Sequence, residues 1–353
     1  MFIRKLILAS SLVFSWSLIA RETSDVVVMN NGDHFTCKIK KLDAGVLYVG
    51  LDYADGDVSI DWKKVARIES NQLFVIKTQD GSVLRGALRI PATAEVQQPK
   101  QLEIPESPGA GKPARVENSQ IVDVRQTADR PLERLSGNVS AGMTYSKGND
   151  ATQYNIASQT QYQEERWAAQ ANLSSNLVAN SGTTTSTRNS LSTNSYHLLP
   201  WHNYFYGGVA DLLQSSVQGI RLQASLGGGV GRFLIDKDRA RIALMGGLVW
   251  QTTQYEVKNT AQPVQNIAAG LIGMKVSLFQ FGKTQLNIGA EVLPALSGRG
   301  RVRFNTHASY FVKVFGTISW VSTFYGNWDT NPPPGFSSSD YGTTSGLSWG
   351  FGK

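Results

Sequence analysis

Basic side chains recur in strand-like segments of the second half of this sequence, at every second position. The clearest segment runs from Arg301 to Val314, where Arg303, His307 and Lys313 alternate with mostly apolar residues. Because alternate residues of a strand point to opposite faces, these polar groups share one face. Fixed positive charge along a water-filled passage favours anions. The residues that we expect to line such an interior are Arg221, Arg239, Arg241, Lys275, Glu291, Arg301, Arg303, His307 and Lys313.

Enzymatic chemistry has little support among the other reactive side chains. The histidines are His34, His197, His202 and His307, and the single cysteine is Cys37. A lipid hydrolase embedded in the membrane needs a nucleophile beside a base, and the pattern shows no such pair. Paired His/Cys spacing typical of metal sites is also missing. We therefore expect no catalytic residue, metal or cofactor, and Cys37 is expected to be a partly buried strand residue.

Composition and charge indicate an exported membrane protein. Arg4 and Lys5 precede an apolar stretch that ends at Ala20, so residues 1–20 are predicted to be a signal peptide. The later chain has no apolar segment near the roughly 20 residues of a membrane-spanning helix. The net charge is −1 over residues 21–130 and +6 over residues 131–353. Without clustered Lys/Arg runs, and with export predicted, nucleic acid is not an expected partner.

Residues 21–130 are predicted to form a small periplasmic β domain with two repeat units. Short apolar runs are separated by turn signals such as Asn31-Gly32, which favour hairpins. Residues 32–37 align with residues 81–86, and residues 59–68 align with residues 115–124. A repeat of this kind indicates two copies of one unit. We place a long loop of the second unit in the middle of residues 91–113 and the joint to the next domain near Thr127 to Leu132.

Residues 131–353 are predicted to form an antiparallel transmembrane β-barrel of about 12 strands, so the fold class is all-β. Segments of alternating polarity are close to the roughly 9 to 11 residues that cross a membrane. Short breaks, such as Asp236 to Asp238, alternate with longer ones, such as Val257 to Val264. This is the pattern of tight periplasmic turns and long external loops. The chain closes with Gly352 and Lys353 after Phe351, although barrels generally end in an aromatic residue that the barrel assembly machinery reads.

The chain resembles the exported barrels often labelled salt-induced outer membrane protein, otherwise classed as a domain of unknown function. The resemblance rests on Met29 to Asp33, Leu47, Tyr53-Ala54, Ile60-Asp61-Trp62 with Val65 and Ile68, and the closing DTNPPPG of Asp329 to Gly335. Cys37 stands where the repeat has a glycine, Gly86. The resemblance implies a periplasmic β domain ahead of a barrel in the outer membrane of a Gram-negative bacterium. It implies no substrate or reaction.

Three functions follow from these observations. The first is a narrow, anion-preferring channel or porin-like barrel, unless its charges pair with one another and plug it. The second is a non-conducting envelope anchor whose periplasmic domain binds a protein or peptidoglycan. The third, lipid hydrolysis, is the least supported. All three place the barrel in contact with outer-membrane lipid.

Overall fold

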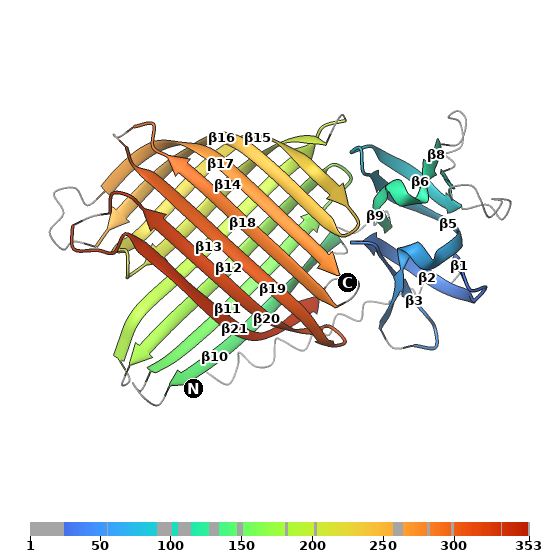
Figure 1. Cartoon of the computed structure of the whole chain (residues 1–353), viewed down its shortest axis with the longest axis horizontal. Coiled ribbons are helices and arrows are strands. Elements are labelled where there is room, and N and C mark those ends of the chain that lie inside the picture. The colour runs from blue at the N-terminus through green and yellow to red at the C-terminus, as the bar shows by residue number, and fades with distance from the viewer. Residues whose placement is uncertain are drawn as a thin grey trace, which may run out of the picture.

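The computed structural model describes residues 25–54, 56–89, 101–104, 114–126, 134–146, 151–180, 183–200, 203–256, 264–280, 283–297, 300–332 and 334–351. These residues are almost entirely strand, in a small amino-terminal sheet and a large closed barrel that lie end to end (Figure 1). Among them, no helix has the length and apolar character needed to cross a membrane. The all-β prediction is thus confirmed. The predicted signal peptide and the joint at residues 127–132 lie outside the described residues.

The amino-terminal domain is built around a four-stranded closed unit. The strands of the whole domain are β1 (Asp25–Met29), β2 (His34–Asp43), β3 (Val46–Gly50), β4 (Asp57–Asp61), β5 (Val65–Thr78), β6 (Val83–Arg89), β7 (Gln101–Ile104), β8 (Ala114–Glu117) and β9 (Ile121–Gln126). Both β1 and β9 pair with β2 and with β5, so these four strands form a ring. The other strands extend the sheet from β2 and from β5.

The same order of elements occurs twice in this domain. A short 3-10 helix, η2 (Trp62–Lys64), joins β4 to β5, and a second one, η3 (Asn118–Gln120), joins β8 to β9. The Trp62 indole donates a hydrogen bond of 3.0 Å to the Asn118 carbonyl, which links the two helices. Gly32 and Gly81, in the turns after β1 and β5, have φ of 89° and 86°, a conformation that favours glycine. Within the segment expected to be a loop, residues 101–104 form β7.

The core of this domain is apolar and contains the single cysteine. Phe74, Ile39, Ile68 and Ile121 are fully buried together with Cys37. Burial, with a smaller contribution from the charge of Asp25, raises the pKa of the Cys37 thiol to about 12. The thiol is therefore neutral and fully buried, whereas the sequence predicted a strand residue that is only partly buried.

We expect Cys37 to resist a thiol-reactive reagent at pH 8 in the folded protein and to react once the domain is unfolded. The thiolate is the nucleophile that attacks such a reagent, and burial suppresses formation of the thiolate. Because the folded pKa lies above the ordinary value of 9.0, this group's contribution to stability is complete below pH 9 and is lost as the pH rises from 9 to 12. The check is the modification rate against denaturant concentration. Equal rates in native buffer and in denaturant would contradict the prediction.

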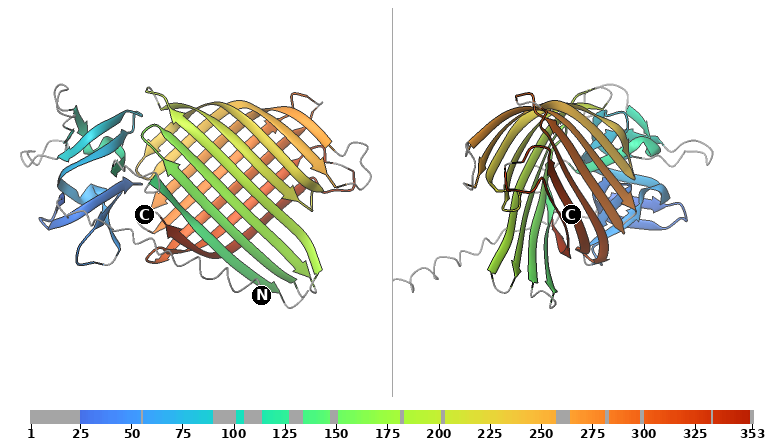
Figure 2. Two further views of the ribbon diagram at one scale, coloured as in Figure 1. Left: turned by 180° about the vertical axis from the view of Figure 1, so that it is seen from behind. Right: turned by 60° about the vertical axis from the view of Figure 1, so that its left-hand side comes forward.

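The barrel has the predicted number of strands, twelve, and each is antiparallel to its neighbours (Figure 2). The strands are β10 (Leu135–Ser146), β11 (Ala151–Gln163), β12 (Trp167–Asn180), β13 (Thr183–Leu198), β14 (Tyr204–Ser215), β15 (Ile220–Lys237), β16 (Ala240–Tyr255), β17 (Val264–Gln280), β18 (Thr284–Pro294), β19 (Val302–Phe315), β20 (Ile318–Asp329) and β21 (Ser339–Phe351). The ring is closed by β10 and β21, where Gly137 to Ala141 pair with Leu347 to Phe351. The longest of these strands, β15, has 18 residues, more than the roughly 9 to 11 expected.

The outer face of the barrel is apolar. On β15 and β16, Leu226, Val230 and Leu248 are 68%, 66% and 64% exposed, whereas their neighbours Ser225 and Val249 point inward and are buried. Apart from Tyr53 and Leu73, every exposed large apolar side chain among the described residues belongs to the barrel or its loops. Exposed apolar area of this extent marks a surface that a lipid layer or a partner covers.

Candidate functional site: the barrel interior

One row of residues crosses the inner wall of the barrel. Phe233, Ala243, Lys275, Gly289 and His307 are successive Cα partners from β15 to β19. Residues facing each other across neighbouring strands share a face of the sheet, so all five point inward. A Cβ added to Gly289 would lie 2.1 Å from His307 Cε1, which means that the imidazole lies over this glycine. The Lys275 ammonium donates a hydrogen bond to Gln170 Oε1 on β12.

This row borders a cavity of about 690 Å³ that we call the central cavity. Both the barrel and the amino-terminal domain line it. The charged residues of its lining are the basic Lys40, Lys41, Arg125, Arg241, Lys275, Lys283 and Lys313 and the acidic Asp43, Asp57 and Glu291. Positive charge thus predominates around the enclosed space.

The amino-terminal domain lies at the end of the barrel where the tight turns lie (Figure 1), and it contributes residues to the lining of the cavity. The Lys77 ammonium contacts Asp236 Oδ2 at 2.5 Å, and Arg241 Nε donates to the other oxygen of Asp236 at 2.9 Å. Asn203, in the turn before β14, donates its side-chain amide to the Gln79 carbonyl. Burial lowers the pKa of the Lys77 ammonium, although Asp236 acts in the opposite direction. Buried polar contacts therefore fix the domain on the rim.

Replacing Lys77 by methionine is expected to loosen the domain from the rim. Asp236 keeps Arg241 as a partner, so the barrel stays folded, while docking loses a charged contact of about 1.5–3 kcal/mol. The readout is cross-linking of Arg85→Cys to Glu165→Cys by a short bismaleimide, because Arg85 of the domain and Glu165 of a barrel turn form an ion pair of 3.5 Å. Cross-linking should slow in the Lys77→Met background and remain unchanged with Lys64→Met, which alters an exposed lysine. An equal rate in all backgrounds would show that Lys77 does not hold the domain.

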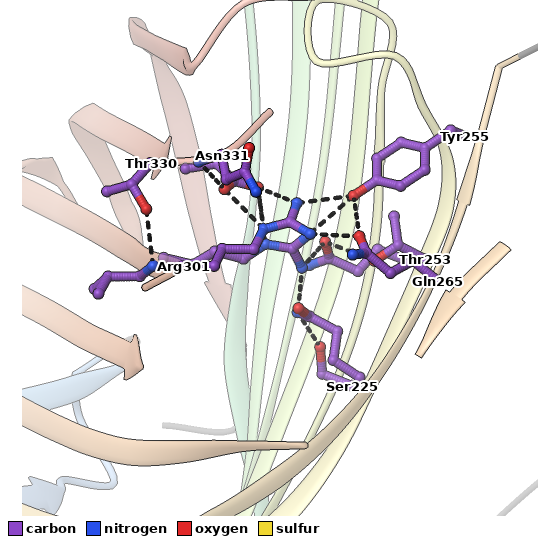
Figure 3. A network of polar contacts seen from close by, with 12 residues as sticks. Ser225, Thr253, Tyr255, Gln265, Arg301, Thr330 and Asn331 are labelled. Carbon is purple, nitrogen blue, oxygen red and sulfur yellow. Dashed lines mark hydrogen bonds and ion pairs between the residues drawn. The ribbon is translucent and has the colours of Figure 1, made fainter. Parts of the chain in front are cut away.

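At the opposite end, buried polar residues cross the barrel (Figure 3). Arg301 Nε donates to Asp329 Oδ1 at 2.9 Å, and Arg303 Nε donates to Asp329 Oδ2 at 3.0 Å. The same guanidinium groups donate to neutral acceptors on β15, β16 and β17. These acceptors are Tyr255 Oη, Gln223 Oε1, Gln251 Oε1 and Gln265 Oε1. We call this set the arginine network.

A second ion pair lies inside the barrel near the arginine network. Arg188 Nη1 donates to Asp340 Oδ2 at 2.9 Å, and the Ser215 hydroxyl donates to the same oxygen at 2.7 Å. The guanidinium of Arg188 also lies 4.6 Å from the ring centre of Tyr325. With the arginine network, this pair occupies the interior at the end away from the amino-terminal domain.

The nine predicted interior residues fall into three groups. Five line the central cavity: Arg241, Lys275, Glu291, His307 and Lys313. Arg301 and Arg303 are buried in the arginine network, where Asp329 pairs with both and balances one of their two positive charges. These two arginines follow the alternative given with the channel hypothesis, in which interior charges pair with one another.

The prediction was wrong for Arg221 and Arg239, which are exposed and do not line the cavity. Arg221 lies at a β-bulge, where the register shifts between Ile220 and Leu222 and the alternation of faces breaks. Arg239 lies in the turn before β16, so no strand fixes its direction.

Several functional residues were missed because their partners are distant in sequence. Asp329 opens the closing DTNPPPG segment, but nothing there indicates a pair with Arg301. The same holds for Arg188 with Asp340, and for Lys77 with Asp236. Among the described residues, no three His, Cys, Asp or Glu side chains form a group that could hold a metal ion.

Comparisons with known proteins give a family and distant structural likenesses. Residues 139–351 match the model of a family described as "Protein of unknown function, DUF481". No curated protein matches the chain significantly in sequence. The chain is similar to the translocator domain of the autotransporter NalP from Neisseria meningitidis, at 16% identity over 62% of this chain and 88% of that chain, with a TM-score of 0.32. It is also similar to Omp33 from Acinetobacter baumannii, at 10% identity over 62% of this chain and 98% of that one, with a TM-score of 0.26. Likenesses this low carry no argument about function.

Proposed function

Because this chain belongs to the DUF481 family, whose description assigns no activity, we propose a function from its own geometry. The protein is an outer-membrane barrel that provides a narrow, anion-preferring pathway, restricted by the arginine network at one end and by the amino-terminal domain at the other. The domain lies on the periplasmic side, since it docks at the tight turns. That this chain is one of the barrels labelled salt-induced outer membrane protein stays a prediction.

The charge of the central cavity carries this proposal. Seven Lys or Arg and three Asp or Glu side chains line it. Arg241, Arg125 and Lys40 have carboxylate partners in Asp236, Asp123 and Asp57. None of the ion pairs between described residues includes Lys275, Lys283 or Lys313. Unbalanced positive charge in a confined aqueous space attracts anions and repels cations.

Chloride efflux from liposomes tests whether the arginine network restricts the pathway. The variant Arg301→Gln/Arg303→Gln/Asp329→Asn removes the three charges together and keeps polar side chains of similar size. It is expected to release chloride several-fold faster than the unaltered protein. Arg221→Gln, at an exposed position outside the network, should leave the rate unchanged. If the triple variant folds and releases chloride no faster, the network is not the restriction.

The same closure favours the envelope anchor as a second candidate. Buried contacts hold the domain on the rim, and ion pairs fill the other end of the interior. An anchor requires the full-length protein to retain a periplasmic protein or peptidoglycan in a pull-down. Retention that persists when chloride efflux is absent in every variant would support this candidate over the pathway.

For lipid hydrolysis, the structure adds no supporting contact within its described residues. The ring of His197 stacks on Tyr206 at a centroid distance of 5.3 Å, and His307 lies in the central cavity. His202 lies outside the described residues. Absence of enzymatic activity therefore stays an expectation.

A further inference from the structure

Part of the lining of the central cavity is aromatic. Tyr196 on β13, Phe205 on β14 and Phe233 on β15 pack together, with ring centroids 5.1 to 5.7 Å apart. All three line the cavity, beside Ala243 and Met245 of β16. We call this surface the aromatic wall. A passage for hydrated inorganic ions has no need of such a surface, because apolar side chains give no hydrogen bonds to replace lost water.

A lysine adjoins the aromatic wall, in the same row as Phe233. Lys275 faces Ala243, which in turn faces Phe233. On the other side it faces Gly289, over which the His307 imidazole lies, so the side towards Ala243 is the one without a large neighbouring side chain. Lys275 is exposed to the cavity, and its ammonium donates a hydrogen bond to the neutral amide oxygen of Gln170. Its charge is thus accessible next to an apolar surface.

We propose that the central cavity binds an amphipathic organic anion, with its acidic group on Lys275 and its apolar part against the aromatic wall. This inference names the class of solute for the pathway proposed above, and it rests on that pathway for access to the site. The cavity volume of about 690 Å³ lies in the range of small-molecule sites, which combine mostly apolar walls with a few polar groups. Phe233 and Lys275 are two strands apart in one row, so a single small molecule spans them.

Calorimetric titration of the full-length protein in phosphatidylcholine nanodiscs tests the inference with a matched pair of probes. These are 4-phenylbutyrate and its neutral analogue 4-phenylbutan-1-ol, with inorganic phosphate as an anion that lacks an apolar part. We expect 4-phenylbutyrate to bind and the other two to bind much more weakly. Lys275→Gln should weaken 4-phenylbutyrate binding on the order of tenfold, by loss of a charge-assisted hydrogen bond. Lys275→Arg should retain binding, and Lys237→Gln, an exposed lysine outside the lining, should not change it.

Three results would overturn the inference, and two of them are patterns of probe binding. Equal uptake of the acid and the alcohol, unaltered by Lys275→Gln, would show partition into lipid, and equal binding of phosphate would show a simple anion site. Chloride efflux, measured on the same preparations, separates this inference from the pathway itself. Efflux without 4-phenylbutyrate binding overturns the inference alone, whereas binding without efflux in any variant overturns the pathway and leaves the binding site.

Discussion

Replacing Asp329 by alanine is expected to lower the free energy of unfolding of the barrel by about 3–5 kcal/mol. Arg301 and Arg303 are 5% and 6% exposed, and Asp329 is the carboxylate that both of them contact. Without it, two guanidinium groups stay buried with only neutral acceptors such as Tyr255 and Gln223. Removing one member of a buried ion pair costs more than the pair contributes, because the remaining charge stays out of water.

The measurement is urea unfolding of the barrel in lipid vesicles, followed by tryptophan fluorescence. Asp329→Asn should destabilise the barrel less than Asp329→Ala, since the amide oxygen still accepts a hydrogen bond. Glu256→Ala, at an exposed carboxylate just after β16, is the control and should change the free energy of unfolding by less than about 0.5 kcal/mol. If Asp329→Ala lowers the free energy of unfolding by less than about 1 kcal/mol, water reaches the guanidinium groups, and the arginine network does not close its end of the barrel.

Replacing Phe74 by alanine is expected to destabilise the amino-terminal domain by about 3–5 kcal/mol while the barrel remains folded. Phe74 lies on β5, is fully buried, and belongs to a core formed only by residues of this domain. Truncation removes apolar contacts and leaves a cavity that a closed four-stranded ring cannot fill by a small shift. The clusters inside the barrel, such as Val249 with Ile267 and Leu271, are separate.

Native-state hydrogen exchange on the full-length protein resolves this effect by segment. Exchange should rise in β1, β2, β5 and β9 and stay constant in the barrel strands. Leu73→Ala is the matched control, because Leu73 is the neighbour of Phe74 on the same strand and is 44% exposed. Loss of protection throughout the barrel would show that the two parts fold as one unit.

The sequence predicted the architecture well because alternation and turn residues act locally. The polar residues of β19, from Arg303 to Lys313, face inward as their spacing required, since no bulge interrupts them before Lys313. The prediction that Arg221 faces the interior was wrong because one inserted residue at a bulge reverses the face of the residues beyond it. Twelve strands could be counted from breaks in a pattern, which requires no knowledge of which residues meet across the barrel.

The arrangement of the interior could not be predicted in the same way. Asp329 and Arg301 meet because β20 follows β19 in the ring, whereas Arg188 and Asp340 meet across the interior, at a distance that depends on strand tilt and stagger. The contact between Lys77 and Asp236 depends on how two folded parts dock, and neither residue is unusual in its local sequence. Pairing decides whether a charge is available to an anion, so the sequence indicated interior charges without showing which are neutralised.

The most direct test of the anion pathway is the reversal potential of single-channel currents in a planar bilayer under a potassium chloride gradient. Openings of the full-length protein are predicted to reverse at an anion-selective potential. The variant Lys275→Glu/Lys313→Glu, which reverses two unpaired charges of the central cavity, should move that potential towards cation selectivity. Cation-selective openings of the unaltered protein, or silence of a folded barrel even in the Arg301→Gln/Arg303→Gln/Asp329→Asn variant, would contradict the account.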